Sequence, residues 1–267
     1  RRIPFVAYVG TAHSLDSNFK SKVMNALFAA GTLRIYKKNP VLAKTSAAKE
    51  ELRQLGVPHA VIAPVGLDIA VLKKNIPADE KMRLRKEHGF EADDVILCNV
   101  SRLSWEKRPL ELIDLFLQVK GKKKFKLIIV GNGPLEEELN EKIRKNGLEK
   151  EVKIYPNVPY EKMWEIYEMS DYYLNMNKGE IFGMAIMEAV YYKTSVAAIR
   201  ALGPSVTLKD MKGHKLCEND DEMAEWITGP YPSEKDLQES SEKMAATFTW
   251  DRCADAFLQA SSEKSSR

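Results

Sequence analysis

Short apolar runs alternate with amphipathic stretches along almost the whole chain. The apolar runs, which are typical of strands buried on both faces, lie at residues 5–10, 41–45, 59–63, 95–100, 126–130, 152–155, 172–176 and 195–199. Helical spacing of apolar positions marks residues 18–30, 47–55, 78–88, 110–119, 134–145, 161–169 and 183–192. This repetition predicts an α/β fold with a parallel, doubly wound sheet and right-handed crossovers. The charged helix 78–88 is expected to be a surface connector rather than part of the core.

The composition narrows the class of protein. There are 41 Lys and Arg against 38 Asp and Glu, a net charge of +3, which argues against a dedicated nucleic-acid binder because such proteins gather a basic surplus on one face. The longest apolar stretch, residues 61–72, is interrupted by proline, glycine and aspartate and is shorter than the ~20 residues of a membrane span. Cys98, Cys217 and Cys253 are far apart and odd in number, so they predict neither a zinc site nor a disulfide framework.

Two cations follow the predicted strand 95–100. Arg102 and Lys107 lie five residues apart in SRLSWEKRP, a loop that leads into a helix. Ligands of doubly wound sheets bind outside the carboxyl ends of the strands, where positive charge and free backbone N–H groups suit a diphosphate. The alternative is a pair of surface charges. The sequence GNGP at 131–134 permits close approach of a ligand to the backbone, but a plain strand-to-helix turn explains it equally well.

The segment GEIFGMAIME at residues 179–188 is the most informative. Glu180 follows a predicted strand, where its carboxylate is placed to accept hydrogen bonds from sugar hydroxyls. Gly183 begins a helix, so a phosphate can approach the free N–H groups of Gly183 and the residues after it. Glu188 lies about one and a half turns into this otherwise apolar helix. Its position predicts contact with a ligand, and a buried ion pair is the alternative.

Together these motifs resemble the donor-binding half of the GT-B glycosyltransferases, most of all the retaining enzymes of glycosyltransferase family 4. The resemblance rests on R-x4-K, on GNGP, and on two glutamates separated by seven residues with FG between them. Further matches are PVGLD at 64–68, the interdomain linker of that family, residues 170–171 before a strand, and residues 248–250 at the start of the last helix. The resemblance covers most of residues 40–258 and implies the GT-B fold, with Rossmann-like donor and acceptor domains.

The resemblance also implies a role for each motif residue. The residues implied to bind the donor diphosphate are Arg102, Lys107, Gly183 and Met184. Those implied to hold the donor sugar are Glu180, Phe182 and Gly183, and those implied to hold the ribose and base are Glu188, Asn157 and Val158. The implied catalytic residues are Glu180 and His13, which resembles the family's histidine facing the donor sugar from the N-terminal domain. For His13, a loop histidine without a function is the alternative.

Several positions depart from the family pattern. Ile181 and Ser101 stand where glycine is usual, and residues 193–194 replace a glycine expected soon after the motif helix. The segment GPSV at 203–206 lacks the acidic residue that often follows a similar glycine. These positions belong to the walls of the family's donor pocket, so they bear on the identity of sugar and base more than on donor binding itself.

The chain contains no Asp-x-Asp pair, with which metal-dependent, single-domain transferases hold a cation on the diphosphate. The absence of this pair, together with the cations Arg102 and Lys107, favours a reaction without metal or cofactor. The donor is then expected to be a UDP-, GDP- or ADP-sugar. The family retains anomeric configuration, which implies attack by the acceptor on the face that the diphosphate leaves. The alternative is a nucleotide-sugar-binding module or a subunit of a split transferase, and an epimerase or phosphorylase of the same fold is a weaker one.

The predicted domains are a partial N-terminal Rossmann-like domain at 1–66, a nucleotide-sugar donor domain at 67–245, and a C-terminal helix at 246–267 that crosses back to the first domain. A complete acceptor domain normally takes ~150 or more residues. Because the chain also begins with Arg1, we expect a truncated N-terminal part or a partner chain that supplies the rest. The resemblance implies a glycan or lipid-linked acceptor and a cytoplasmic protein, with peripheral contact at the inner membrane face as a further expectation.

Overall fold

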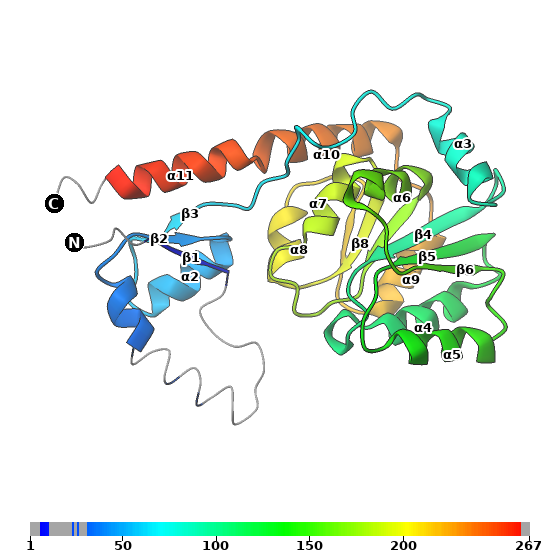
Figure 1. Cartoon of the computed structure of the whole chain (residues 1–267), viewed down its shortest axis with the longest axis horizontal. Helices are drawn as coiled ribbons and strands as arrows, with labels where there is room; N and C mark the ends of the chain where they lie inside the picture. The colour runs from blue at the N-terminus through cyan, green and yellow to red at the C-terminus, as the bar shows by residue number, and fades with distance from the viewer. Residues whose placement is uncertain (1–5, 11–22, 24–25, 27–30, 263–267) are drawn as a thin grey trace. The chain divides into compact units, whose positions relative to one another are not determined.

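The computed structural model of the chain describes residues 6–10, 23, 26 and 31–262 (Figure 1). The chain divides into a small unit, made of residues 1–68 and 247–267, and a large unit, made of residues 69–246. His13 and most of the predicted helix 18–30 lie outside the described residues.

The small unit contains a parallel sheet whose described strands have the order β1-β2-β3. The strands are β1 (Ala7–Val9), β2 (Val41–Ala43) and β3 (Val61–Ile62), and the helices packed on them include α2 (Ser46–Gln54) and α11 (Trp250–Ser262). The side chain of Thr45 begins α2 by accepting a hydrogen bond of 3.0 Å from the N–H of Ala48, as an N-cap threonine does.

Both faces of β2 are covered, which explains its run of apolar residues without polar alternation. Val41 and Ala43 belong to the apolar cluster that includes Leu52 of α2. Leu42, between them, belongs to the cluster that includes Cys253 of α11. The C-terminal helix thus completes the core of the small unit, although almost two hundred residues separate it from β3 in the sequence.

The PVGLD motif brings the start of α11 against the end of the β3 segment. The N–H of Leu67 donates to the carbonyl of Phe248 at 2.9 Å. A Cβ atom on Gly66 would lie only 2.1 Å from the backbone nitrogen of Trp250, so a side chain at this position would force the two segments apart. Glycine is required here for close backbone approach.

The large unit contains a parallel sheet with the strand order β6-β5-β4-β7-β8-β9. Its strands are β4 (Val95–Val100), β5 (Phe125–Val130), β6 (Val152–Tyr155), β7 (Tyr172–Asn175), β8 (Ser195–Ile199) and β9 (Lys215–Cys217). Its α-helices are α3 (Glu80–Glu87), α4 (Pro109–Val119), α5 (Glu136–Lys145), α6 (Met163–Met169), α7 (Met184–Tyr191), α8 (Leu202–Thr207), α9 (Asp220–Thr228) and α10 (Glu234–Thr247), and 3-10 turns lie at η1 (Trp105–Lys107) and η2 (Tyr160–Lys162). This doubly wound, Rossmann-like order confirms the predicted fold class.

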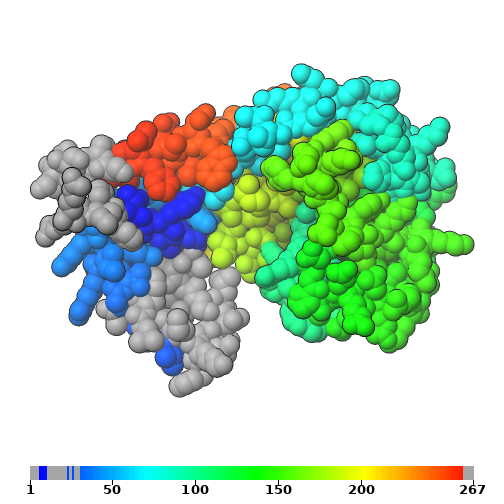
Figure 2. Space-filling view, viewed as in Figure 1, coloured from blue at the N-terminus to red at the C-terminus, as the bar shows by residue number. Residues whose placement is uncertain are grey.

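Helices cover both faces of this sheet. Helices α4, α5 and α9 lie on one face, and α3, α6 and α7 lie on the other (Figure 1). The segment leading into α3 and helix α6 form part of the surface of the large unit in Figure 2. The four central strands β5, β4, β7 and β8 are almost entirely buried, and Cys98 of β4 is among their enclosed side chains. In the edge strand β9 Cys217 is also enclosed.

The predicted strands 95–100, 152–155 and 195–199 are confirmed to the residue. Strand β9 and helix α8 were not predicted. The first is only three residues long and begins with a lysine, and the second contains glycine and proline within LGPSVT. Neither offers the apolar period on which prediction of an element depends.

The expectation that the charged helix 78–88 is only a surface connector is wrong for one of its faces. Arg85 of α3 is 5% exposed. Its guanidinium donates to Asp171 at 2.7 Å and to the carbonyl of Met169 at 3.0 Å. Asp171 also accepts hydrogen bonds from the ammonium of Lys81 and the N–H of Ile96. A buried arginine is accommodated because the carboxylate and carbonyls replace its water shell.

His214 contributes a pH-dependent term to the stability of the large unit. Its Nδ1 accepts a hydrogen bond of 3.0 Å from the N–H of Val196, so Nε2 carries the proton in the neutral ring. Nε2 is enclosed and has no hydrogen-bond partner in the described part of the chain. Burial lowers the pKa of His214 to about 4, well below the ~6.5 of an unfolded chain.

Between these two pKa values the unfolded chain binds a proton that the folded chain does not, so acid favours unfolding. We expect His214 to remove about 3 kcal/mol of unfolding free energy between pH 7 and pH 4. Denaturant unfolding at a series of pH values checks this in the wild type and in His214→Asn, whose amide oxygen retains an acceptor. Identical pH profiles for the two proteins would contradict the assignment.

Candidate functional site

Strands β4 and β7 are neighbours in the sheet, and the chain leaves them toward opposite sides of the strand order. A doubly wound sheet opens a crevice at the carboxyl ends of two such strands. The loop that contains Arg102 and Lys107 follows β4, and the loop that contains Glu180 follows β7. The predicted diphosphate-binding and sugar-binding segments therefore meet at this point of the sheet.

Lys107 and Glu180 are in direct contact. The ammonium of Lys107 donates to Oε2 of Glu180 at 2.9 Å, and the two side chains are 24% and 16% exposed. The amide of Asn177 donates to the same Oε2 at 3.2 Å, while its own Oδ1 accepts from the N–H of Gly179 at 2.9 Å. The Glu180 carboxylate is therefore fixed in position from two directions.

The surroundings of Glu180 act on its pKa in both directions. Burial, the largest effect, raises the pKa of this carboxyl, but the hydrogen bond and charge of Lys107, with hydrogen bonds from Asn177 and Asn175, outweigh burial and leave the pKa below its usual range. Glu180 is thus held as a carboxylate, an acceptor-only group that suits a donating hydroxyl or a developing positive charge.

Gly183 shapes the start of α7. Its φ of +86° lies in the left-handed region, and a Cβ atom there would lie 2.7 Å from Cδ1 of Ile186. Glycine therefore lets the chain turn from Glu180 into the helix. Phe182 is 6% exposed beside this turn, whereas Met184 is 37% exposed at the first helical position. The helix N-terminus carries partial positive charge.

Glycines of the GNGP motif pack against the loop after β4. A Cβ atom on Gly131 would lie 2.0 Å from the carbonyl oxygen of Ser101, and one on Gly133 would lie 2.4 Å from that of Leu103. Both glycines have positive φ. The sequence left open whether these glycines allow a ligand to approach or only form a turn. The structure shows that they are needed for contact between the loops after β4 and β5.

Arg102 is exposed, in contrast to Lys107. Its guanidinium donates to Glu106 at 2.8 Å, and its side chain is 70% exposed. A second arginine of this loop, Arg108, makes a partly buried ion pair and was not singled out from the sequence. Arg108 binds Asp220 at the start of α9 through two hydrogen bonds of 3.0 and 2.7 Å, and its φ is +55°. It anchors the loop that holds Lys107.

Glu188 is 8% exposed on α7 and makes no ion pair within the described residues. The hydroxyl of Tyr167 on α6 donates to its Oε2 at 2.7 Å. Burial raises the pKa of Glu188, and the hydrogen bonds from Tyr167 and Tyr160 only partly oppose this. The buried ion pair considered as an alternative is therefore wrong, since a tyrosine hydroxyl takes the place of the cation.

Asn157 and Val158, predicted to lie near the base, follow β6. Asn157 is exposed and its Oδ1 accepts a hydrogen bond of 3.0 Å from the amide of Asn132 in the GNGP motif. This links the loops after β5 and β6, which are neighbours in the sheet. The structure thus places Arg102, Lys107, Asn157, Glu180 and Gly183 on loops and a helix start at the carboxyl side of the sheet. Glu188 lies within α7 against Tyr167, and His13 lies outside the described residues.

Asn177 and Asn175 are the neighbours of Glu180 that sequence reasoning missed. Asn177 is 5% exposed and Asn175 6% exposed, and the N–H of Asn177 donates to Oδ1 of Asn175 at 3.0 Å. The available signal was an Asn-x-Asn pair at the end of a buried strand, where a polar side chain has to find a hydrogen-bond partner.

In residues 6–10, 23, 26 and 31–262, no helix is both long and apolar enough to cross a bilayer. The same part of the chain holds no cluster of three or more His, Cys, Asp or Glu side chains arranged to bind a metal ion.

Known proteins similar to this chain include one named as a glycosyltransferase. D-inositol 3-phosphate glycosyltransferase of Mycobacterium avium is 26% identical over an alignment of 288 residues, which covers 95% of this chain and 63% of that protein. The crystal structure of Anabaena Alr3699/HepE in complex with UDP and glucose superposes with a TM-score of 0.77 at 19% identity, covering 99% of this chain and 72% of that one. Sucrose-phosphate synthase of Thermosynechococcus elongatus gives 0.78 at 15% identity, covering 98% and 68%.

At these identities the two solved structures establish a shared fold, which is the GT-B type predicted from the motifs. The chain spans less than two thirds of the length of its mycobacterial relative. The family model for glycosyl transferases group 1 matches residues 80–244, which is more than half of the chain and includes all the candidate residues of the large unit. The chain belongs to the glycosyl transferases group 1 family.

Proposed function

We propose that this protein takes part in glycosyl transfer, moving a sugar from a nucleotide-diphosphate sugar to a hydroxyl of a glycan or lipid-linked acceptor. The observation that carries the proposal is the contact of 2.9 Å between Lys107 and Glu180 at the carboxyl ends of β4 and β7. It joins a cation for the diphosphate to a carboxylate for the sugar in the crevice where doubly wound sheets bind ligands. The relative named for D-inositol 3-phosphate and the solved structure containing UDP and glucose support the same class of reaction.

The donor is proposed to lie with its diphosphate between Lys107, Arg102 and the N-terminus of α7. Arg102 is exposed enough to exchange Glu106 for a phosphate. The backbone N–H groups of Gly183 and Met184 supply hydrogen bonds at a helix N-terminus, where an anion is favoured. Fixed positive charge of this kind stabilises a leaving diphosphate without a metal ion.

The sugar is proposed to lie over Glu180, beside Phe182 and Gly183. In the reaction, the acceptor oxygen forms a bond to the anomeric carbon while the bond from that carbon to the diphosphate oxygen breaks. Both events occur on one face of the sugar, and the hydroxyl proton passes to a phosphate oxygen, so the anomeric configuration is retained. Glu180 orients the sugar and opposes its developing positive charge. Glu188 is proposed to hold the ribose after release from Tyr167, with Asn157 and Val158 near the base.

Donor binding tests this assignment directly. We expect UDP-glucose, GDP-mannose or ADP-glucose to raise the melting temperature, since a ligand at about 100 times its Kd adds about 2.7 kcal/mol. For the donor that does so, calorimetry should give at least tenfold weaker binding by Glu180→Ala, because the sugar loses its charged acceptor. Lys142→Ala is the control, since Lys142 is 26% exposed in an ion pair with Asp114 between α4 and α5. Equal affinity of wild type and Glu180→Ala would exclude the proposed site.

Turnover distinguishes an enzyme from the binding module considered as the alternative. With donor and a suitable acceptor, an enzyme releases the nucleoside diphosphate, and proton NMR of the product reports whether the anomeric configuration is retained. Tight donor binding with no release in the presence of any acceptor extract would favour a binding module or a subunit that needs a second chain. An inverted product would refute the retaining step while leaving the donor site intact.

A further inference from the structure

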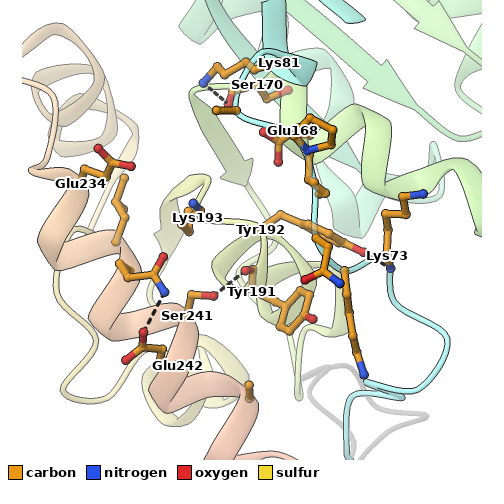
Figure 3. A pocket seen from close by; sticks show the side chains of 18 of the residues that line it. Lys73, Lys81, Glu168, Ser170, Tyr191, Tyr192, Lys193, Glu234, Ser241 and Glu242 are labelled. Atoms are coloured by element: carbon orange, nitrogen blue, oxygen red, sulfur yellow. Dashed lines mark hydrogen bonds between the residues drawn. The ribbon is translucent and has the colours of Figure 1, made fainter.

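A cavity lies beside the amino ends of strands β7 and β8 of the large sheet. It has a volume of about 880 Å³, which is within the range of small-molecule sites. Ser170 precedes β7 and Lys193 precedes β8, and both line it, whereas the candidate donor residues follow the carboxyl ends of strands. The other walls come from the segment before α3, from α6 and from α10 (Figure 3). Donor binding leaves this cavity unused.

Charged side chains line the cavity from four parts of the chain, one of them partly buried (Glu168) and three exposed (Lys74, Lys193 and Glu234). Among the described residues, no hydrogen bond or ion pair engages the carboxylates of Glu168 on α6 and Glu234 on α10, or the ammonium groups of Lys74 and Lys193. Glu168, Glu234 and Lys193 lie around the same open space in Figure 3. Burial raises the pKa of Glu168, and the charges of Lys81 and Lys193 only partly reverse this.

The mixture of positive and negative side chains limits the class of ligand that can bind in this cavity. An anion would meet Glu168 and Glu234, and a cation would meet Lys74 and Lys193. A hydroxyl satisfies both kinds of group at once, because it donates to a carboxylate, which only accepts, and accepts from an ammonium, which only donates. A ligand with many hydroxyls does so at several points of the wall.

Tyrosine rings supply the apolar part of the same wall. Tyr231 is 45% exposed, yet it is held in place by an edge contact of its ring with Tyr172 and by its hydroxyl, which donates to the carbonyl of Asp171. Tyr191 and Tyr192 pack edge to face at 5.0 Å, and both line the cavity. Fixed aromatic faces beside hydrogen-bonding groups suit a ligand that is apolar on its C–H faces and polar at its edges.

We propose that this cavity binds a neutral oligosaccharide without acting on it, at a site separate from the donor site. The sugar hydroxyls are shared between Glu168, Lys193 and Glu234, and the C–H faces of the sugar rings lie on Tyr191 and Tyr231. Strand β7 lies between Ser170 and Glu180, and helix α7 lies between Gly183 and Lys193, so ~12 Å of chain separates the cavity from the residues proposed to hold the diphosphate and the sugar. Glu188, proposed to hold the ribose, lies nearer, one turn before Tyr192 on α7. A carbohydrate chain held here stays on the protein during a reaction elsewhere.

Binding of maltotriose, cellotriose and chitotriose to the whole chain tests the proposal. We expect saturable binding of at least one trisaccharide at millimolar concentration, measured by calorimetry and saturation-transfer NMR. Glu168→Gln and Lys193→Gln should each weaken it about tenfold, because each substitution removes a charged hydrogen-bond partner. Glu165→Gln, on the same helix but outside the cavity, and the exposed Lys209→Gln are the matched controls and should bind as the wild type does. Melting temperatures establish that all four variants are folded.

Three results would overturn the proposal: no saturable binding of any trisaccharide by the folded wild type, equal binding by Glu168→Gln and the wild type, or displacement of the trisaccharide by UDP. Displacement would place the sugar in the donor site instead. Saturable binding of inorganic phosphate at the cavity, lost in Lys193→Gln, with no binding of the trisaccharides, would identify an anion site and also refute it. The proposed function has its own test in Glu180→Ala, which should leave trisaccharide binding unchanged.

Discussion

Replacing Lys107 with alanine is expected to lower kcat by about a hundred- to a thousandfold, the usual loss when one group that stabilises transition-state charge is removed. Negative charge on the diphosphate grows as its bond to the sugar breaks, so the ammonium gains more from the transition state than from the bound donor. The loss should therefore be larger in kcat than in donor affinity. Steady-state kinetics of nucleotide release, with a donor and acceptor that support turnover, measure both quantities.

Lys107→Ala also frees Glu180 from its cation, which makes a second variant necessary. Lys107→Arg keeps the charge beside Glu180 and should retain part of the activity, whereas Lys107→Met should behave like alanine. Lys142→Ala again serves as the control, since Lys142 is as buried as Lys107 and bonds a carboxylate in the same unit. If Lys107→Ala raised KM with kcat unchanged, Lys107 would bind donor and transition state equally, and its role in leaving-group stabilisation would be refuted.

Replacing Asp171 with alanine is expected to lower the unfolding free energy of the large unit by about 3–5 kcal/mol, as is typical when one member of a buried ion pair is removed. Asp171 is 17% exposed in its side chain and bonds both Arg85 and Lys81. It also accepts the N–H of Ile96 at the start of β4. The substitution would leave the guanidinium of Arg85, 6% exposed in its side chain, without its carboxylate.

Urea unfolding followed by circular dichroism measures this effect as a shift of the midpoint. Asp93→Ala is the comparison, because Asp93 bonds Lys124 at the surface, with both side chains 64% exposed. Water replaces a surface partner of this kind, so Asp93→Ala should unfold close to the wild type. The double variant Asp171→Ala/Arg85→Met should recover part of the lost stability, since it removes the uncompensated charge. Equal midpoints for Asp93→Ala and Asp171→Ala would contradict the structural role of the buried pair.

The predictable part of the fold is the part whose burial is visible in the sequence. Strands β4 and β8 are mostly apolar runs that end next to charged or turn residues, and their bounds were predicted to the residue. Arg85 could not be predicted in the same way. Its charge indicates a surface position, and only the fold brings Asp171, some ninety residues later, to meet it. Long-range pairing overrides local polarity at such a residue.

In the candidate site, too, some residues could be predicted from the sequence and others could not. Lys107 and Glu180 were identified separately by their positions after strands, and the neighbouring placement of β4 and β7 joins them. The partner of Glu188 was not predictable, because Tyr167 lies on another helix and a tyrosine gives no sign of pairing with a carboxylate. The sequence thus identifies the groups that carry charge, while the structure identifies the neutral groups that hold them in place.

The rates at which the buried cysteines are alkylated report how often each unit opens. Cys98 and Cys217 lie in the large sheet and Cys253 lies on α11 of the small unit, all of them enclosed. Burial raises the pKa values of Cys98 and Cys217 to about 12, so these thiols react with alkylating reagents only after local or global unfolding. Mass spectrometry of alkylation over time would therefore report separate opening rates for the two units in the unmodified chain. Donor binding should slow the labelling of Cys98, while the rate at Cys253 gives the internal reference.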